Sequence, residues 1–115
     1  MTTAAVLDEP TFRRMVDDVF RRIDDAFAEI DPDLAESNFL QGTLTIVVKG
    51  KRLIVSPQPP VRQIWVAFKD RGWHLDFDRE AGVWRDDRGL GLELFSLVQD
   101  LIKTEVGVAV SIARG

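Results

Sequence analysis

The sequence has no cysteine and only one histidine, His74. Without cysteine, the chain cannot form disulfides, thiolate nucleophiles, zinc ribbons or an iron–sulfur cluster held by its own residues. One histidine and no cysteine also argue against Ser–His–Asp and Cys–His catalytic triads. The reactive groups that remain are mainly carboxylates, because 19 of the 115 residues are aspartate or glutamate.

Long apolar runs are also missing. No stretch approaches the roughly 20 residues that a membrane-spanning helix needs. The first residues, MTTAAVLDEPTF, have neither the basic and apolar regions of a secretory signal nor the arginine-rich character of a transit peptide. We therefore expect a cytoplasmic protein with no membrane partner. We expect it to fold as a single domain over residues 1–115, with residues 1–10 as a flexible N-terminal arm.

Positive charge is scarce near the N-terminus. Residues 1–42 carry ten acidic and four basic residues, a net charge of −6, whereas residues 43–115 carry nine acidic and eleven basic residues, a net charge of +2. Binding of nucleic acid requires a basic surface, so the acidic end disfavours a nucleic-acid partner. The same end favours cations or a basic protein surface.

Apolar residues at helical spacing predict a helix over residues 11–30. Pro10 suits the first turn of this helix, and Pro32 marks its far end. A second amphipathic helix is predicted over residues 91–104, followed by a short extended tail at residues 108–112.

Between the two helices the apolar period changes to two, and turn-like segments separate short runs rich in β-branched and aromatic residues. Such short connections imply antiparallel neighbours, because a parallel crossover needs about a dozen residues or more. The pattern predicts an α+β protein in which both helices pack on one face of an antiparallel sheet of about five or six strands. The predicted strands are residues 43–50, 51–56, 61–68, 73–78 and 83–86.

Alternation divides the side chains of strand 61–68 between the two faces of the sheet. Ile64 and Val66 lie on the better core face, so Gln63 and Trp65 are expected on the open face. Tryptophan is enriched at protein interfaces, and an exposed one suggests a binding surface. The alternatives are that the faces are swapped or that Trp65 packs on a neighbouring aliphatic side chain.

The same alternation in WHLDFD (residues 73–78) turns His74, Asp76 and Asp78 outward. His74 with Asp76 is a secondary metal candidate, because imidazole and carboxylate groups can bind the same ion. A solvated polar face is the preferred interpretation. Trp84 is expected in the core.

Residues 23–36, IDDAFAEIDPDLAE, hold six carboxylates and no lysine or arginine. Earlier in the same helix, two aspartates have an arginine at i+4, which predicts the ion pairs Asp17–Arg21 and Asp18–Arg22. The later acids have no such partner and crowd the helix C-terminus, where the macrodipole disfavours negative charge. Acidic residues kept at an unfavourable helix end, without basic partners, suggest a function. We name the following candidate metal ligands the acidic ridge: Asp17, Asp18, Asp24, Asp25, Glu29, Asp31, Asp33 and Glu36.

Exposed carboxylates without histidine or cysteine are hard oxygen ligands, which suit Fe²⁺, Fe³⁺, Mn²⁺ and Ca²⁺. Exposed ligands that do not converge imply weak, multiple and loosely selective sites. Oxygen chemistry alone does not select iron. The alternative for such a run of acids is a solvated face without a ligand.

Several motifs follow one another along the chain: aspartate pairs in the first helix, then LTI, PQPPVRQIWVAFKDRGWHLDFD, W-x-DDRG and a final amphipathic helix. The most specific part is Gln58-x-Pro60-x-x-Gln63-Ile64-Trp65, followed by Gly72-Trp73-His74. Over residues 12–112 this pattern resembles the bacterial frataxin (CyaY-type) family.

The resemblance implies an α-β sandwich that binds iron weakly along the acidic ridge, with other divalent cations as alternatives. It implies a role in iron–sulfur cluster assembly, as iron donor or as iron-dependent regulator of the cysteine desulfurase. It further implies that the ridge, including Asp24 and Asp25, docks on a basic desulfurase surface, while Gln63 and Trp65 contact the scaffold protein. We expect a monomer, with iron-driven oligomers as an open alternative.

The chain departs from the family pattern in three respects. Ser56-Pro57-Gln58 stands where Asn-Arg-Gln is common, which removes a basic contact. The acidic loop after the first helix is one residue shorter, and Ala28 and Ala35 stand where family members often have acids. We therefore expect a lower metal capacity or a different ligand set.

Two other functions stay open from the sequence. One is a metal-independent interaction module whose acidic face docks on a basic partner, with binding that falls steeply as salt rises. The other is an enzyme, but a convex helix gives paired carboxylates no concave site in which to separate their pKa values. We expect no enzymatic activity beyond a weak ferrous oxidation on the ridge. Haem ligation by His74 is a more remote alternative.

Overall fold

The computed structural model describes residues 7–114. The first helix, α1 (Glu9–Phe27), begins after Asp8, whose carboxylate accepts a hydrogen bond of 2.8 Å from the backbone N–H of Thr11. This cap fixes the start of the helix. The buried side chains of α1 form one stripe along the helix, and this stripe packs on the sheet. They are Phe12, Val16, Val19, Phe20, Ile23 and Phe27.

Six strands form one antiparallel sheet in their order along the chain, so β1 and β6 are its edges. Two hairpins turn on residue pairs with positive φ, Gln41–Gly42 and Lys49–Gly50, a geometry that matches the twist of the flanking strands. The elements are β1 (Ala35–Leu40), β2 (Thr43–Val48), β3 (Lys51–Gln58), the 3-10 helix η2 (Pro59–Val61), β4 (Gln63–Phe68), β5 (Arg71–Asp78) and β6 (Val83–Asp86).

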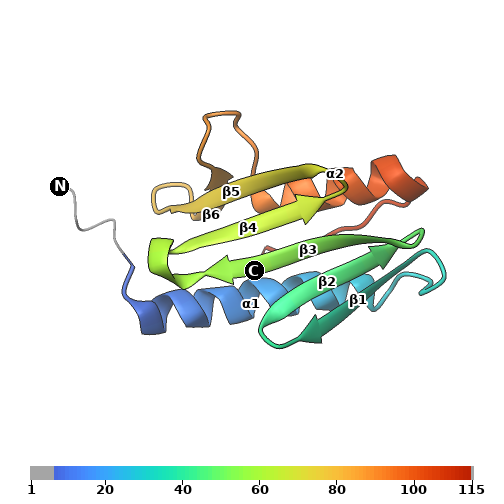
Figure 1. The fold of residues 1–115 in the computed structure, drawn as a ribbon, viewed down its shortest axis with the longest axis horizontal. Coiled ribbons are helices and arrows are strands. Elements are labelled where there is room, and N and C mark those ends of the chain that lie inside the picture. The colour runs from blue at the N-terminus through green and yellow to red at the C-terminus, as the bar shows by residue number, and fades with distance from the viewer. Residues whose placement is uncertain (1–6, 115) are drawn as a thin grey trace.

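The last helix, α2 (Leu94–Val106), covers the same face of the sheet as α1 and leaves the other face open (Figure 1). Its N-terminus is capped by the carboxylate of Glu93, which accepts hydrogen bonds from the backbone N–H groups of Phe95 and Ser96. It ends at Gly107 with φ of 73°, a left-handed conformation that glycine adopts without strain. Both ends of α2 are therefore stabilised by suitable residues.

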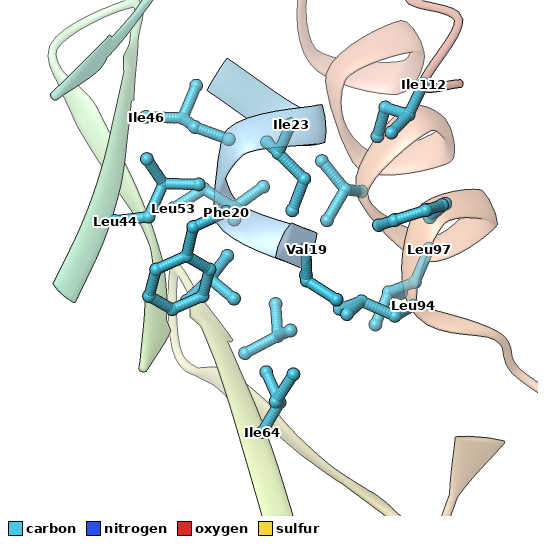
Figure 2. Packing of buried hydrophobic residues seen from close by; sticks show 14 of the residues in the cluster. Val19, Phe20, Ile23, Leu44, Ile46, Leu53, Ile64, Leu94, Leu97 and Ile112 are labelled. Carbon is cyan, nitrogen blue, oxygen red and sulfur yellow. The ribbon is translucent and has the colours of Figure 1, made fainter. Parts of the chain in front are cut away.

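The core lies between the sheet and the two helices. Figure 2 shows Val19 and Ile23 of α1 between Leu44 and Ile46 of the sheet and Leu97 of α2. Within the described residues no polar or charged side chain is buried, so the carboxylates stay at the surface. The structure confirms the predicted α+β sandwich with both helices on one face of the sheet.

The segment after α2 has no regular secondary structure, but it closes one side of the core. Ile112 is only 4% exposed, and its backbone N–H donates a hydrogen bond of 2.9 Å to Oε1 of Gln99 in α2. Nη1 of Arg22 in α1 donates one of 3.2 Å to the carbonyl of Ala113. The tail thereby links the two helices.

The helix boundaries differ from the sequence prediction. α1 starts at Glu9 and ends at Phe27 instead of spanning residues 11–30, and α2 spans Leu94–Val106 instead of 91–104. Asp8 therefore caps α1 and Glu9 and Pro10 are its first residues, so these three are not part of a flexible arm, while residues 1–6 lie outside the described part. Over residues 7–114, neither helix is long and apolar enough to cross a membrane.

The sequence pattern does not predict β1. Its residues, AESNFL, show no alternation and include residue types that are uncommon in strands. The strand forms because it pairs with β2 along its whole length, from Ala35 opposite Val48 to Leu40 opposite Thr43. Tertiary pairing thus overrides a weak local preference.

The tail offers a direct test of its contribution to the core. Ile112→Ala is expected to lower the free energy of unfolding by about 2–4 kcal/mol, because it removes a buried side chain. Ser111→Ala, which shortens an exposed side chain of the same tail, is expected to change it by less than about 0.5 kcal/mol. Urea unfolding measures both values, and equal losses for the two variants would contradict the packing of Ile112 in the core.

Candidate functional site

The acidic ridge follows the exposed side of α1 and the segment that leads into β1. Seven of its eight carboxylates are exposed, and Asp18 is partly buried. In residues 7–114, Asp18 alone among these eight takes part in an ion pair. The last turn of α1 contains no basic residue, so the side chains add negative charge to the negative end of the helix dipole.

Two arginines of α1 bind the same carboxylate. Nη2 of Arg21 lies 2.6 Å from Oδ1 of Asp18, and Nε of Arg22 lies 2.7 Å from Oδ2. The predicted Asp18–Arg22 pair is confirmed, but the predicted Asp17–Arg21 pair is wrong, because Arg21 turns to the acid three residues before it. The hydrogen bond from Arg22 and the charges of both arginines hold the pKa of Asp18 below its ordinary value. Both oxygens of Asp18 are occupied, which makes it a poor metal ligand.

Two further ridge acids stabilise the chain around them. Asp24 accepts a hydrogen bond from the hydroxyl of Ser37, which joins α1 to β1. Oδ1 of Asp31 accepts one of 2.9 Å from the backbone N–H of Asp33, a turn that aspartate commonly forms in loops. Within the described residues, the second oxygen of Asp24 and of Asp31 accepts no hydrogen bond.

Glu36 lies on the other side of the sheet from the rest of the ridge. Ser37 reaches Asp24, and the ring of Phe39 packs edge-on against Phe20 of α1, so the odd-numbered residues of β1 face the helix. Glu36 therefore points to the open face. The prediction that Glu36 extends the metal-binding ridge is corrected by this geometry.

The remaining six ridge acids spread along the surface. Asp17 and Asp24, for example, are about 10 Å apart along the helix axis, given the rise of an α-helix. In the part of the chain that the structure describes, no three His, Cys, Asp or Glu side chains form a group that could hold a metal ion. The arrangement can offer a cation one or two carboxylates at a time, with water as the other ligands.

A second polar group lies on the open face of the sheet. Trp65 and His74 are opposite each other in the β4–β5 ladder, and their rings stack with centroids 4.2 Å apart. Oε1 of Gln63 accepts a hydrogen bond of 2.8 Å from Nε1 of Trp65, while its Nε2 donates to Asp76 at 3.0 Å and to Asp87 at 3.1 Å. Nδ1 of His74 lies 3.7 Å from Oδ2 of Asp87. We name these five residues the Gln63 cluster.

The cluster confirms that Gln63 and Trp65 belong to the open face. The neighbour that covers Trp65 is His74, not an aliphatic side chain. His74 lies near Asp87, and Asp76 accepts a hydrogen bond from Gln63; the two as a metal-ligand pair stay a prediction. The expected partner surface and the secondary metal candidate thus form one surface, joined by hydrogen bonds of Gln63 and by the stacking of His74 on Trp65. Trp84, at 5% exposure, lies in the core as expected.

The sequence did not point to Asp87 as a member of the cluster. The carboxylate of Asp86 accepts backbone hydrogen bonds from Leu90 and Leu92, each of 2.8 Å, and thereby shapes the loop after β6. The backbone N–H of Asp87 donates one of 2.9 Å to the carbonyl of His74. The DDRG motif signals a turn, but a turn signal does not say which strand the loop returns to.

A frataxin-like domain model matches residues 5–108 of this chain. The chain belongs to the frataxin-like family. It is 42% identical over 82 residues to the iron-sulfur cluster assembly protein CyaY of Pseudomonas aeruginosa, covering 70% of this chain and 75% of that protein. It is 27% identical over 108 residues to the protein of the same name from Pseudoalteromonas atlantica, covering 94% and 97%.

The fold agrees with this membership. A solved structure of frataxin from Psychromonas ingrahamii matches with a TM-score of 0.84 and 24% identity, over 94% of this chain and 100% of that one. The two helices on a six-stranded antiparallel sheet are therefore the frataxin fold. Iron binding, desulfurase docking and scaffold contact at the named residues stay predictions.

The hydrogen bonds of the Gln63 cluster can be tested in this frataxin-like protein. Gln63→Ala is expected to lower the free energy of unfolding by about 0.5–1.5 kcal/mol and to speed solvent exchange of the Trp65 indole N–H in NMR spectra. Gln58→Ala is the control, because Gln58 lies opposite Gln63 in β3 and its side chain makes no capping hydrogen bond. Equal protection of Trp65 in both variants would contradict the bond to Gln63.

Asp86 is expected to make the stability of this surface depend on pH. The backbone hydrogen bond from Leu90, followed by those from Leu92 and Arg88, lowers the pKa of Asp86 from its ordinary value of 3.8. A carboxyl with a lowered pKa stabilises the fold above its ordinary pKa, and the stabilisation is lost as the pH falls through the lowered value. Asp86→Asn should therefore have a lower Tm near neutral pH, with a gap that shrinks in acid. Thermal unfolding from neutral to acidic pH measures the difference in Tm between the wild type and Asp86→Asn. A difference that stays constant with pH would contradict this role of Asp86.

Proposed function

We propose that this chain is an iron-binding protein of iron–sulfur cluster assembly, acting as an iron donor or as an iron-dependent regulator of a cysteine desulfurase. Its relatives from P. aeruginosa and P. atlantica are named for that process. One observation carries the proposal: six exposed acids of the ridge have no ion pair within residues 7–114. They are Asp17, Asp24, Asp25, Glu29, Asp31 and Asp33.

The chemistry of these acids suits weak binding of iron. Carboxylate oxygens are hard ligands that accept Fe²⁺ and Fe³⁺, and they also accept other divalent cations. Because the six acids do not converge, each ion keeps several water ligands and can be released readily. A donor requires such release. An ion shared between the carboxylates of two copies would also produce iron-driven oligomers of an otherwise monomeric protein.

The two polar surfaces suit different tasks in this proposal. The ridge, with Asp24 and Asp25 at its centre, presents negative charge to a basic surface of the desulfurase and attracts it over a distance. The Gln63 cluster holds Gln63 and Trp65 in a fixed geometry through hydrogen bonds and ring stacking. A surface ordered before binding loses less conformational entropy, which suits contact with the scaffold protein.

A second candidate function is a metal-independent module that docks on a basic partner through the ridge. The observation that favours it is the absence of a converging metal-ligand group in residues 7–114. An enzymatic role has less support, because the ridge acids do not converge on one site within residues 7–114. Weak ferrous oxidation is the one activity that such a surface suggests.

The proposal is tested by anaerobic Fe²⁺ titration of the ¹⁵N-labelled protein, followed by residue-resolved NMR. Broadening is expected within residues 17–33. The double variant Asp24→Lys/Asp25→Lys is expected to bind Fe²⁺ at least about tenfold more weakly, because it replaces two attractive charges with two repulsive ones. The control is Asp70→Lys/Asp100→Lys, which makes the same change of charge at two exposed acids outside the ridge, and it should keep the wild-type pattern.

The same variants should then be titrated with a purified bacterial cysteine desulfurase at low and high salt. Loss of both iron and desulfurase binding in the ridge variant supports the iron-dependent role. Loss of desulfurase binding alone, with iron broadening spread over the whole surface, supports the metal-independent module. If the ridge variant binds both as the wild type does, the proposal fails.

A further inference from the structure

Phe39 is an exposed aromatic side chain to which neither metal binding nor charge attraction assigns a role. It lies on the edge strand β1 and is 54% exposed, although its ring packs edge-on on Phe20 with centroids 5.5 Å apart. The next residue, Leu40, is 71% exposed but points to the opposite, open face of the sheet. An exposed aromatic ring beside a charged surface suggests an interaction site.

Phe39 lines two hollows along α1. The first has a volume of about 310 Å³ and is lined by Asp17, Phe20, Arg21, Asp24 and Phe39. The second, of about 150 Å³, shares three of these residues and extends along α1 toward η2. Together they make a groove between α1 and the β1–β2 hairpin, which we name the Phe39 groove.

The free charges at the rim of this groove are negative. Asp17 makes no ion pair within the described residues, and Asp24 uses one oxygen for Ser37. The two arginines that line the groove are already paired, Arg13 with Glu9 and Arg21 with Asp18. The groove thus places an apolar aromatic surface beside two carboxylates.

This combination matches the chemistry of arginine more closely than that of lysine. The planar guanidinium group stacks on aromatic rings and pairs with carboxylates at the same time. The long aliphatic stem of arginine can lie along an apolar surface while its charged end reaches a rim. A lysine ammonium also contacts aromatic rings, but it is more strongly hydrated and cannot stack flat on a ring or form two parallel hydrogen bonds with a carboxylate.

We infer that the Phe39 groove receives an arginine side chain of the basic partner that docks on the acidic ridge, with the guanidinium at the carboxylates of the rim. The inference rests on the proposed docking function and adds the contact that anchors it. Phe39 supplies stacking area, and Asp17 and Asp24 supply the charge. Unlike the charge attraction along the ridge, stacking on Phe39 is little affected by salt.

The test compares the affinity of the wild type and four variants for a purified bacterial cysteine desulfurase by calorimetry. Phe39→Ser is expected to weaken binding about fivefold to thirtyfold, the range of a desolvated cation–π contact. Phe39→Leu keeps an apolar cover on Phe20 and preserves folding, and it should still weaken binding at least about threefold. Leu40→Ser, a matched change on the other face, should bind as the wild type does. Thermal unfolding confirms that each variant is folded.

Asp25→Lys separates failure of this inference from failure of the proposed function, because Asp25 lies outside the groove. If Asp25→Lys leaves desulfurase binding unchanged, the docking function fails. If Asp25→Lys weakens binding while both Phe39 variants match the wild type, only the groove inference is overturned. If Phe39→Ser weakens binding but Phe39→Leu does not, the occupant is an apolar side chain and the arginine assignment is overturned.

Discussion

The packing of α1 against the sheet is the interaction on which the other features of this protein depend. One stripe of α1 is apolar and buried, so the opposite side must face water, and the four aspartates of α1 lie there. The same docking brings Asp24 to Ser37 and Phe20 to Phe39, which attaches the edge strand β1. It also lets Arg22 hold the C-terminal tail. The core thereby determines which charges are left without partners.

The C-terminal ends of the two helices differ in whether basic residues compensate their negative charge. The last turn of α2 carries Lys103, and Glu105 of the same helix binds Lys69, which follows β4, at 2.9 Å and Lys51, which begins β3, at 3.2 Å. The last turn of α1 has no base. The chain therefore contains bases that compensate an acid near one helix end, and they are placed at α2. Uncompensated charge at α1 is a local property of that surface, consistent with a role in binding cations or a basic partner.

Local sequence patterns were sufficient to predict much of this protein. Two helices, five of the six strands and the α+β class follow from apolar periodicity, because periods of 3.6 and 2 reflect geometry within single elements. The same reasoning placed Trp65 and Gln63 on the open face and Trp84 in the core. It also located the acidic surface, since a run of like charges is visible in the sequence without knowledge of the fold.

Tertiary structure alone decided which of these residues meet. Arg21 forms an ion pair with Asp18 and not with Asp17. Strand β1 forms because it pairs with β2, and this pairing places Glu36 on the face of the sheet away from the ridge. Asp87 reached the Gln63 cluster through a loop fixed by backbone hydrogen bonds. The sequence by itself determined the elements and the total charge, because these depend on neighbours along the chain. The three-dimensional contacts decided the partners, because they depend on distances between segments that the sequence does not contain.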